Sequence, residues 1–402
     1  MGFLLGLRDF NYSKMVTALA FLIILSVLIL VHEGGHFLAA RRAGILVEEF
    51  GFGLPPRIWG KKIGETIYSI NALPFGGFVR LYGEEEVVGR NKERAFSNKS
   101  QRVRIKILLS GVLMNLLLGV SAFCLVYSFL GIPEKANRIK VEAILEGSPS
   151  QEAGLHRGDI VDKFNGQEVR DNKTFIDLTN KSLGEQVILE VIREGEGSCQ
   201  EEKEERPGVF LEREILAGGN DGENYSYCEK GKLLAVITPR VGYPQNEGPL
   251  GVVISDTEVK FYPFYKMIPK AIYSGFLEAF YWLKEILASL ARLIFSVLAG
   301  RGTMGMDVAG PVGIYQITGE VAKTGGWALI QLAGILSVNL AVLNVIPFPA
   351  LDGGRVAFVL SEKFLGKRKR EKIELWANRV GMVILLLSIL LVTINDIKRI
   401  KG

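Results

Sequence analysis

The chain has 402 residues, of which 48% are hydrophobic and 23% are charged, and its formal net charge is +5 at pH 7. This composition is too hydrophobic for an ordinary soluble enzyme and too rich in charge for a bundle made only of spanning helices. We therefore expect a membrane protein with a soluble module. The basic residues crowd beside apolar runs, as topology signals do, and the sequence carries no nucleic-acid-binding module.

Four apolar segments are long enough to cross a bilayer as helices. They lie at 15–38, 107–130, 328–348 and 380–394, and the last can be extended back to Leu375. The first segment also resembles a signal peptide, with Ala39 and Ala40 near a cleavage site. Cleavage there would discard two histidines that form a motif described below, so we expect the segment to be retained.

The distribution of basic residues predicts how these segments are oriented. Lysines and arginines gather in the loop between the first two segments, from Arg41 to Lys106, and again from Lys367 to Lys372. By the positive-inside rule both loops are cytoplasmic, so the first segment enters the membrane from outside. The C-terminal Lys398, Arg399 and Lys401 then fall outside, which opposes this scheme.

A soluble insertion is predicted at 131–260, between the second and third apolar segments. Within 140–169 the pattern indicates a strand, a Gly-Ser-Pro turn, a short helix, a Gly-Asp turn and a second strand. From Val141 to Ile160 this stretch is similar to a PDZ domain of the circularly permuted bacterial type. The alternative is an extracytoplasmic domain that serves only folding or spacing.

Two later stretches of the insertion, 186–195 and 233–242, also have strand character. An acidic segment from Glu194 to Gly231 lies between them and is typical of an inserted loop. Cys199 and Cys228 bracket polar sequence there, and they could form a disulfide if the segment is extracytoplasmic. The sequence leaves open whether they do.

The stretch 264–300 is apolar but is interrupted by charged residues. These are Lys270, Glu278, Lys284, Glu285 and Arg292. Charged side chains are costly inside lipid, so one or two amphipathic helices at the membrane surface fit this stretch better than a span.

The first apolar segment ends in the sequence His-Glu-Gly-Gly-His, with the histidines at His32 and His36. Residues four apart lie on one face of a helix, so both imidazoles can bind one zinc ion. Glu33 lies about 100° around the helix from His32, where its carboxylate can act as a general base on water without binding the metal. The alternative is that both histidines are structural residues whose ring nitrogens are hydrogen-bonded in the protein core. Burying such polar side chains within a span is costly in free energy unless they serve a function.

A catalytic zinc site needs three protein ligands and an open position for water. The only other histidine, His156, lies in the soluble insertion, so we expect the third ligand to be a carboxylate or a cysteine in another span. The leading candidate is Asp352, at the end of the third apolar segment. Pro347 and Pro349 prevent regular helix before it, and two glycines after it permit a tight turn. The alternative is a carboxylate that only marks a helix end at the interface.

Membrane depth provides a check on these ligands. The histidines lie toward the cytoplasmic end of the first segment, and Asp352 follows the C-terminal end of the third. The two reach the same depth only if both segments run in the same direction. The chain between the second and third segments must then cross the membrane an even number of times or not at all, which favours surface helices at 264–300.

Together these features resemble the site-2 protease family of intramembrane zinc metalloproteases, in particular the bacterial regulator-of-sigma-E protease type. In the second span the family's Gly-Pro-x-x-Asn stands as Gly111-Val112-Leu113-Met114-Asn115, with valine in place of proline. The other matching motifs are His-Glu-x-x-His at His32–His36, Glu-Phe-Gly-Phe-Gly at Glu49–Gly53, Ala-Leu-Pro-Phe-Gly-Gly-Phe-Val at Ala72–Val79, and Asn-x-x-Pro-x-Pro-x-Leu-Asp-Gly-Gly at Asn344–Gly354.

The resemblance implies an α-helical polytopic membrane protein with about four transmembrane helices, an inserted α+β PDZ-like extracytoplasmic domain and a membrane-associated β-hairpin region. The boundaries expected are 1–40 for the first helix, 41–106 for the basic cytoplasmic loop with the hairpins, 107–130 for the second helix, 131–260 for the PDZ-like domain with its acidic insertion, 261–327 for amphipathic helices at the outer interface, 328–354 for the third helix, 355–374 for a cytoplasmic loop, and 375–402 for the fourth helix and tail.

The resemblance also implies roles for individual residues. His32, His36 and Asp352 would hold one zinc ion, and Glu33 would activate water. Asn344 would bind the substrate backbone, with an oxyanion role as an option. Asn115 would do likewise or would make a hydrogen bond that packs helices.

The family's β-hairpin region corresponds to 64–83. There the alternation of Ile67, Ser69 and Asn71 with apolar residues suits a sheet edge that pairs with an unwound substrate strand. The alternative is an ordinary cytoplasmic hairpin.

We therefore expect an intramembrane zinc metalloprotease of the bacterial cytoplasmic (inner) membrane, with its N-terminus and PDZ-like domain extracytoplasmic. Its partners would be membrane lipid and single-span substrates such as anti-sigma factors or remnant signal peptides, cut after an upstream site-1 type protease. The alternatives are a non-proteolytic scaffold or substrate-binding protein with the same fold, and a metal transporter. A scaffold would have lost a catalytic residue, and a transporter would need more polar residues along its spans.

Overall fold

The structure of the chain is a computed structural model, and it describes residues 2–84, 92–193, 215–217, 224–229, 232–244, 247–299 and 309–401. The chain folds into two compact units. The first comprises Met1–Leu130 and Pro263–Gly402, and the second comprises Gly131–Tyr262.

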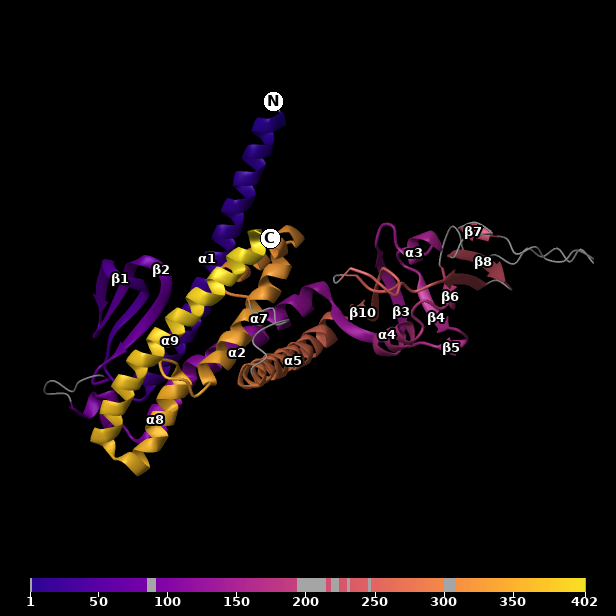
Figure 1. The fold of residues 1–402 in the computed structure, drawn as a ribbon. Coiled ribbons are helices and arrows are strands. Elements are labelled where there is room, and N and C mark those ends of the chain that lie inside the picture. The colour runs from indigo at the N-terminus through magenta and orange to yellow at the C-terminus, as the bar shows by residue number, and fades with distance from the viewer. Residues whose placement is uncertain are drawn as a thin grey trace, which may run out of the picture. The chain divides into compact units, whose positions relative to one another are not determined.

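Helices dominate the first unit (Figure 1). They are α1 (Gly2–Arg42), α2 (Gln101–Leu130), α5 (Phe264–Leu298), α6 (Pro311–Thr324), α7 (Gly326–Val345), α8 (Asp352–Leu365) and α9 (Lys367–Lys401), with two short 3₁₀ helices at Lys92–Arg94 and Phe96–Asn98. Among the described residues, four stretches are long and apolar enough to cross a membrane, namely Lys14–Arg42, Gln101–Leu130, Gly326–Val345 and Lys369–Arg399. The chain is therefore a polytopic membrane protein, as predicted.

Helix α2 packs against α1 on one side and against α7 on the other. Small residues permit these close approaches: a side chain at Gly35 of α1 would meet the Ser110 carbonyl, and one at Gly119 of α2 would meet Val338 of α7. Helix α2 runs unbroken through Val112, where the related family has proline. These contacts bring the C-terminal end of α1 beside the N-terminal half of α2.

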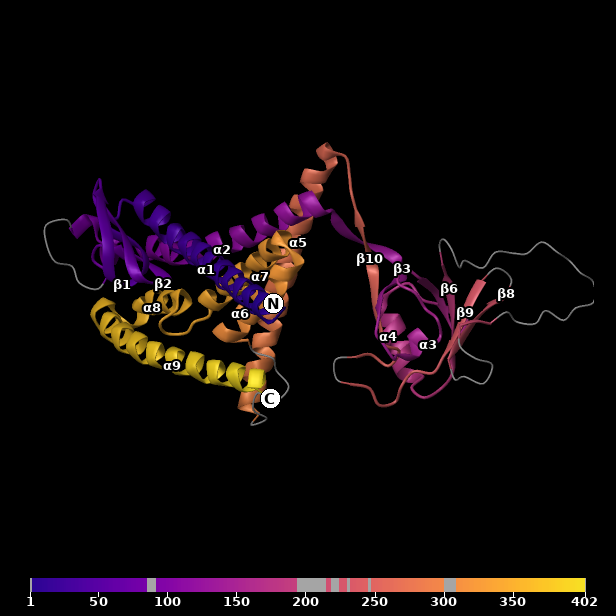
Figure 2. The ribbon, with the colours of Figure 1, turned by 90° about the horizontal axis from the view of Figure 1, so that it is seen from above.

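Helix α5 is one continuous helix of 35 residues and is not among the apolar stretches above. It runs across α2, as Figure 2 shows, and crosses it where Gly275 meets Cys124. Large apolar side chains on α5 remain exposed, among them Phe264, Phe276 and Phe280. The single helix with an uncovered apolar face agrees with the amphipathic character expected from the sequence.

Two long strands, β1 (Val47–Ile63) and β2 (Thr66–Leu81), each fold back on themselves and make a sheet of four segments. The register gives the order 57–63, 66–73, 47–54 and 77–81 across the sheet. The buried carboxylate of Glu49 links its own segment to the segments of Ser69 and Arg57, because it accepts hydrogen bonds from Ser69 (2.6 Å) and Arg57 (2.7 Å).

This order corrects the expected substrate edge. The segment with Ile67, Ser69 and Asn71 is paired on both sides, and the free edge beyond the first half of β1 is 77–81. Ser69 and Asn71 are buried because they bond Glu49 and the Gly53 carbonyl. An alternating pattern that includes polar residues can therefore belong to an internal strand, when groups within the sheet make the hydrogen bonds that those residues need.

In the part that the structure describes, the second unit is one sheet with two small helices. Its strands are β3 (Ile132–Ile144), β4 (Ile160–Phe164), β5 (Gln167–Glu168), β6 (Val187–Ile192), β7 (Ile215–Ala217), β8 (Tyr225–Glu229), β9 (Lys232–Ile237) and β10 (Val252–Lys260), in the order β10-β3-β4-β6-β9-β8-β7 with β5 paired to β4. The expected strand–helix–strand appears as β3, α3 (Pro149–Glu152) and β4. The core is built from residues such as Val141, Phe164 and Leu189.

Helix α4 (Asn172–Lys181) was not expected from the sequence. Asp171 begins it by accepting hydrogen bonds from the backbone and hydroxyl of Thr174, which also hold the pKa of the Asp171 carboxyl below its usual range. Cys199 and the side chain of Cys228 lie outside the described residues, so their pairing stays a prediction.

Candidate metal centre

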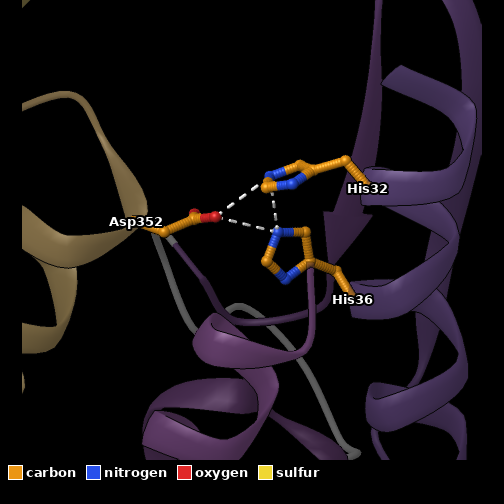
Figure 3. A group of neighbouring side chains, drawn as sticks. All are labelled: His32, His36 and Asp352. Atoms are coloured by element: carbon orange, nitrogen blue, oxygen red, sulfur yellow. Dashed lines mark hydrogen bonds and ion pairs between the residues drawn. The ribbon is translucent and has the colours of Figure 1, made fainter. Parts of the chain in front are cut away.

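His32 and His36 lie one turn apart on α1, and their rings face the first residue of α8, Asp352 (Figure 3). The Asp352 Oδ2 atom is 3.0 Å from His32 Nε2 and 3.1 Å from His36 Nε2. The two Nε2 atoms are themselves 3.3 Å apart. Residues that lie more than 300 positions apart in the sequence (|i−j| = 316 for His36 and Asp352) thus present three donor atoms to one point.

The turn before Asp352 depends on the prolines and glycines noted in the sequence. Helix α7 ends at Val345, and the chain turns through Pro347 and Pro349 before α8 begins. A side chain at Gly353 would stand 2.1 Å from the Val345 carbonyl oxygen, so the turn closes tightly only with glycine there. This packing brings the Asp352 carboxylate back beside the end of its own span.

The outer ring nitrogens of the histidines are also held. His36 Nδ1 lies 2.8 Å from the Ile107 carbonyl oxygen, which can only accept, so Nδ1 carries the proton and Nε2 presents its lone pair. His32 Nδ1 lies 3.3 Å from the side-chain amide of Asn115, whose Oδ1 is buried without a partner. Turning this amide over would let Oδ1 accept from Nδ1–H of His32, which leaves both Nε2 atoms free for a metal.

These donors suit a zinc ion. Two imidazole nitrogens and a carboxylate oxygen are the donor set of a catalytic zinc, and tetrahedral ligands about 2.0–2.2 Å from zinc lie roughly 3.3 Å apart. The observed separations of 3.0 to 3.3 Å are close to that value. His32, His36 and Asp352 thus form a group that could hold a metal ion.

Comparison with known proteins agrees with this geometry. The model of peptidase family M50 matches residues 20–388. The chain belongs to peptidase family M50. A protein assigned as a zinc metalloprotease in Clostridium perfringens is 32% identical over 94% of this chain and 97% of its own length. The regulator of sigma-W protease RasP of Bacillus subtilis is 28% identical over 96% of this chain and 99% of its own length.

A third relative, the zinc metalloprotease RasP of Geobacillus kaustophilus, is 27% identical over 95% of this chain and 97% of its own length. This M50 peptidase is a zinc metalloprotease, which confirms the predicted enzyme class and the predicted zinc cofactor. The family named from its motifs is confirmed as well.

Glu33 of the M50 peptidase follows His32 directly and is half-buried. Its carboxylate interacts electrostatically with both histidines and with Asp352. It also lies beside the free edge of the sheet, since a methyl group at Gly77 would be 3.4 Å from Glu33 Cγ. Glu33 therefore lies near both the three donor atoms and the edge segment 77–81.

The two asparagines lie in different settings. Asn115 is fully buried against His32, so it faces the metal donors and not an open site. Asn344 lies in the last turn of α7, is half-buried, and bonds no side chain or backbone group in the part of the chain that the structure describes. Its amide remains available to another molecule.

Two contacts at the centre were not foreseen from the sequence. Gly111 of α2 lies against the Nε2–Cε1 edges of the histidine rings, and Asn378 of α9 bonds the loop before Asp352. Gly111 was noted only as the start of the motif that ends in Asn115. No local pattern marks Asn378, because its partner lies 28 residues earlier in the chain.

Proposed function

We propose that this M50 peptidase hydrolyses peptide bonds within the membrane-spanning segments of single-span membrane proteins. The observation that carries the proposal is the meeting of three residues. His32 and His36 lie on a helix apolar enough to cross a membrane, and Asp352 follows a second such helix after a short loop. A zinc site built on spanning helices suits a substrate bond that is itself in the membrane. The chain retains every residue that the chemistry needs, which disfavours a scaffold.

His32, His36 and Asp352 would hold the zinc ion. When bound, zinc supplies a Lewis acid that polarises the scissile carbonyl and makes water more acidic. Glu33 takes a proton from the attacking water and delivers it to the leaving nitrogen, for which its place beside the three donors is suited. The hydrogen bond from His36 to the Ile107 carbonyl keeps the imidazole oriented while this happens.

The asparagines would then have separate roles. Asn344, with a free amide beside the broken helix, would bind the substrate backbone. Asn115 would orient His32 through its side-chain amide, and its backbone carbonyl accepts from Ser337 of α7 at 2.7 Å. One residue would thereby serve both the metal ligand and the packing of α2 on α7.

The free edge segment 77–81 would bind the substrate as an added strand. A helical substrate hides its carbonyl groups in hydrogen bonds, so it must unwind before attack, and an extended segment can pair with a sheet edge. A groove of about 690 Å³ runs along this edge, lined by Phe78 to Glu84 and faced by Leu375 and Arg379 of α9. Glu33 lies beside Gly77, the residue before Phe78, which lines the groove.

The hairpin region would touch lipid. Apolar side chains of β1 and β2 that stand exposed include Ile58, Trp59, Ile63 and Leu73. Lys61 and Lys62 lie among them, which suits an anionic membrane surface. This arrangement favours a membrane-associated sheet over an ordinary cytoplasmic hairpin.

The orientation proposed is that of the bacterial cytoplasmic membrane, with the N-terminus and the unit 131–262 outside. The basic loops from Arg41 to Lys106 and from Lys367 to Lys372 would be cytoplasmic. The amphipathic helix α5, which crosses α2 near Cys124 and Tyr127 at the other end from the histidines, would lie at the outer interface.

The second unit would be a PDZ-like domain that excludes substrates with bulky outer domains, so that cleavage follows an earlier cut by a site-1 type protease. The name of the Bacillus subtilis relative, regulator of sigma-W protease, suggests an anti-sigma factor as one substrate. Remnant signal peptides, which are short spans without an outer domain, are a second class that fits.

The test compares the wild-type protein with Glu33→Gln on a panel of single-span substrates in detergent or liposomes, with zinc measured in both. We expect the glutamine variant to lose cleavage while it keeps its zinc, because Glu33 moves protons and does not bind the metal. Equal cleavage by the two proteins would overturn the proposed mechanism.

A further inference from the structure

One face of helix α9 carries a stripe of polar residues and a glycine. This face is turned toward α8 and toward the loop that precedes α8. The stripe consists of Arg370, Glu374, Asn378 and Gly381, spaced by four, four and three positions, so its members lie on one side of the helix. The rest of α9 is mostly exposed and apolar, as expected for a lipid-facing span.

Each residue of the stripe contacts the segment that carries Asp352. Arg370 Nε lies 3.5 Å from Glu362 of α8, and Glu374 lies 4.0 Å from Arg355 of α8. Asn378 Oδ1 accepts a hydrogen bond from the Ala350 backbone at 3.1 Å. A methyl group at Gly381 would stand 2.6 Å from Pro349, so the helix and the loop are in direct contact there.

The loop needs such support because Ala350 has an unusual backbone. Its φ is 77°, in the left-handed region that residues with a side chain rarely adopt. Such a conformation persists only where surrounding contacts impose it. Ala350 lies two residues before Asp352, so its backbone sets the direction in which the chain enters α8 and aims the carboxylate.

Asp352 is also held on its other side. Arg355, one turn later in α8, bonds Glu84, which follows β2, and also faces Glu374. The carboxylate of Glu84 in turn accepts from the backbone of Leu81 on the edge segment, at 3.3 Å. The Asp352 turn is therefore held between Asn378 at Ala350 and a network of ion pairs at Arg355.

We propose that Asn378 is a positioning residue of the metal centre: it fixes Ala350 in the left-handed conformation and so aims Asp352 at His32 and His36. Helix α9 would then support the turn that carries Asp352, in addition to spanning the membrane. This inference rests on the proposed function, in which Asp352 is a zinc ligand.

The test measures zinc affinity in the purified full-length chain by competition with a chromogenic chelator, together with thermal unfolding. Asn378→Leu keeps a side chain of nearly the same size but removes the oxygen that accepts from Ala350. We expect it to weaken zinc binding by about tenfold or more, as the loss of a contact that orients a metal ligand does in other zinc sites. Asn395→Leu is the matched control, because Asn395 is an exposed residue of the same helix. It should bind zinc as the wild type does.

A rescue separates this role from general stabilisation. Glycine adopts a φ of +77° freely, so Ala350→Gly in the Asn378→Leu background should recover most of the lost zinc affinity. If the leucine variant does not fold, Asn378→Ser carries the test, because serine stays polar but is too short to reach the Ala350 amide.

Two results distinguish this inference from the proposed function. Asp352→Ala should abolish tight zinc binding, and wild-type affinity in that variant would overturn the proposed ligand set. If Asp352→Ala loses zinc while a folded Asn378→Leu keeps wild-type affinity, the ligand set stands and the positioning role of Asn378 is wrong.

Discussion

Gly111 of α2 lies against the ring of His36 of α1, so close that a methyl group on Gly111 would stand 2.4 Å from His36 Nε2. The same methyl group would be 2.8 Å from Cε1 of His32. No real β-carbon tolerates such distances, and α2 cannot retreat easily because it is packed against α7 as well. The absence of a side chain at this position is therefore what allows both rings to face Asp352.

Gly111→Ala should displace His36 and disable the centre. We expect zinc affinity to fall by about tenfold or more, with cleavage lost in parallel, because the nitrogen that the methyl group strikes is the one aimed at the metal. Chelator competition and a cleavage assay measure the two effects.

Gly34→Ala is the matched control, since a methyl group at Gly34 meets nothing within 4 Å although it lies between the two histidines. It should retain zinc and activity. A Gly111→Ala protein that bound zinc normally would show that α2 can move away from the histidines.

The sequence predicted the parts of the site that local geometry decides. The spacing of His32 and His36 places their rings together in any helix, and the prolines before Asp352 forbid helix wherever the loop lies. Gly111 and Asn378 could not be found in this way, because their roles depend on which helices become neighbours. That choice is made by packing over the whole unit, which one sequence does not reveal.

The sheet illustrates the same limit. The alternation of Ile67, Ser69 and Asn71 correctly predicted a strand, but period-two patterning does not distinguish an edge from an internal strand. Ser69 and Asn71 are polar because they bond Glu49 and Gly53 inside the sheet, and the free edge is 77–81. The position of the edge changes which residues can be tested for substrate binding.

Val79→Pro should weaken substrate binding while leaving the sheet intact. Backbone N–H groups point alternately to the two sides of a strand. The Tyr82 N–H bonds the Leu46 carbonyl inside the sheet, and the Leu81 N–H points outward to Glu84. The Val79 N–H, two residues before Leu81, therefore also points outward, into the groove. Loss of one such hydrogen bond to a substrate strand should lower kcat/KM by about two- to tenfold.

Val79→Leu, which keeps the N–H, is the control for the proline substitution. Steady-state cleavage of one single-span substrate by both variants measures the effect. Unchanged kcat/KM in a folded proline variant would argue that the substrate does not pair with this edge.

A buried ion pair is expected to hold the second unit together. Asp159 is 1% exposed and accepts from Arg193 Nε and from the second guanidinium nitrogen, both at 2.7 Å. Arg193→Gln would leave the carboxylate buried with fewer partners and should lower the free energy of unfolding of this unit by about 3–5 kcal/mol.

Hydrogen exchange of β4 and β6 in the full chain measures that loss. The exposed pair of Arg170 and Glu168 provides the control, and Arg170→Gln should have little effect on exchange. Equal exchange in both variants would mean that water or another donor satisfies Asp159 without Arg193.

Excision of the second unit tests whether it acts as a size filter. Ile132 and Lys260 are paired in the antiparallel ladder of β3 and β10, so the two ends of the unit are neighbours. Such partners lie about 5 Å apart, a distance that an Asn-Gly turn can close. Replacing 133–259 with Asn-Gly should therefore leave the helices of the first unit joined without strain.

The excised enzyme should cleave a single-span substrate that still carries its bulky outer domain, which the full chain should leave uncut. A substrate trimmed to a short outer stub should be cut by both proteins, because the filter concerns only what lies outside the membrane. Bound zinc and activity on the trimmed substrate establish that the excised protein is folded. If that folded protein still left the intact substrate uncut, the second unit would not be what excludes it.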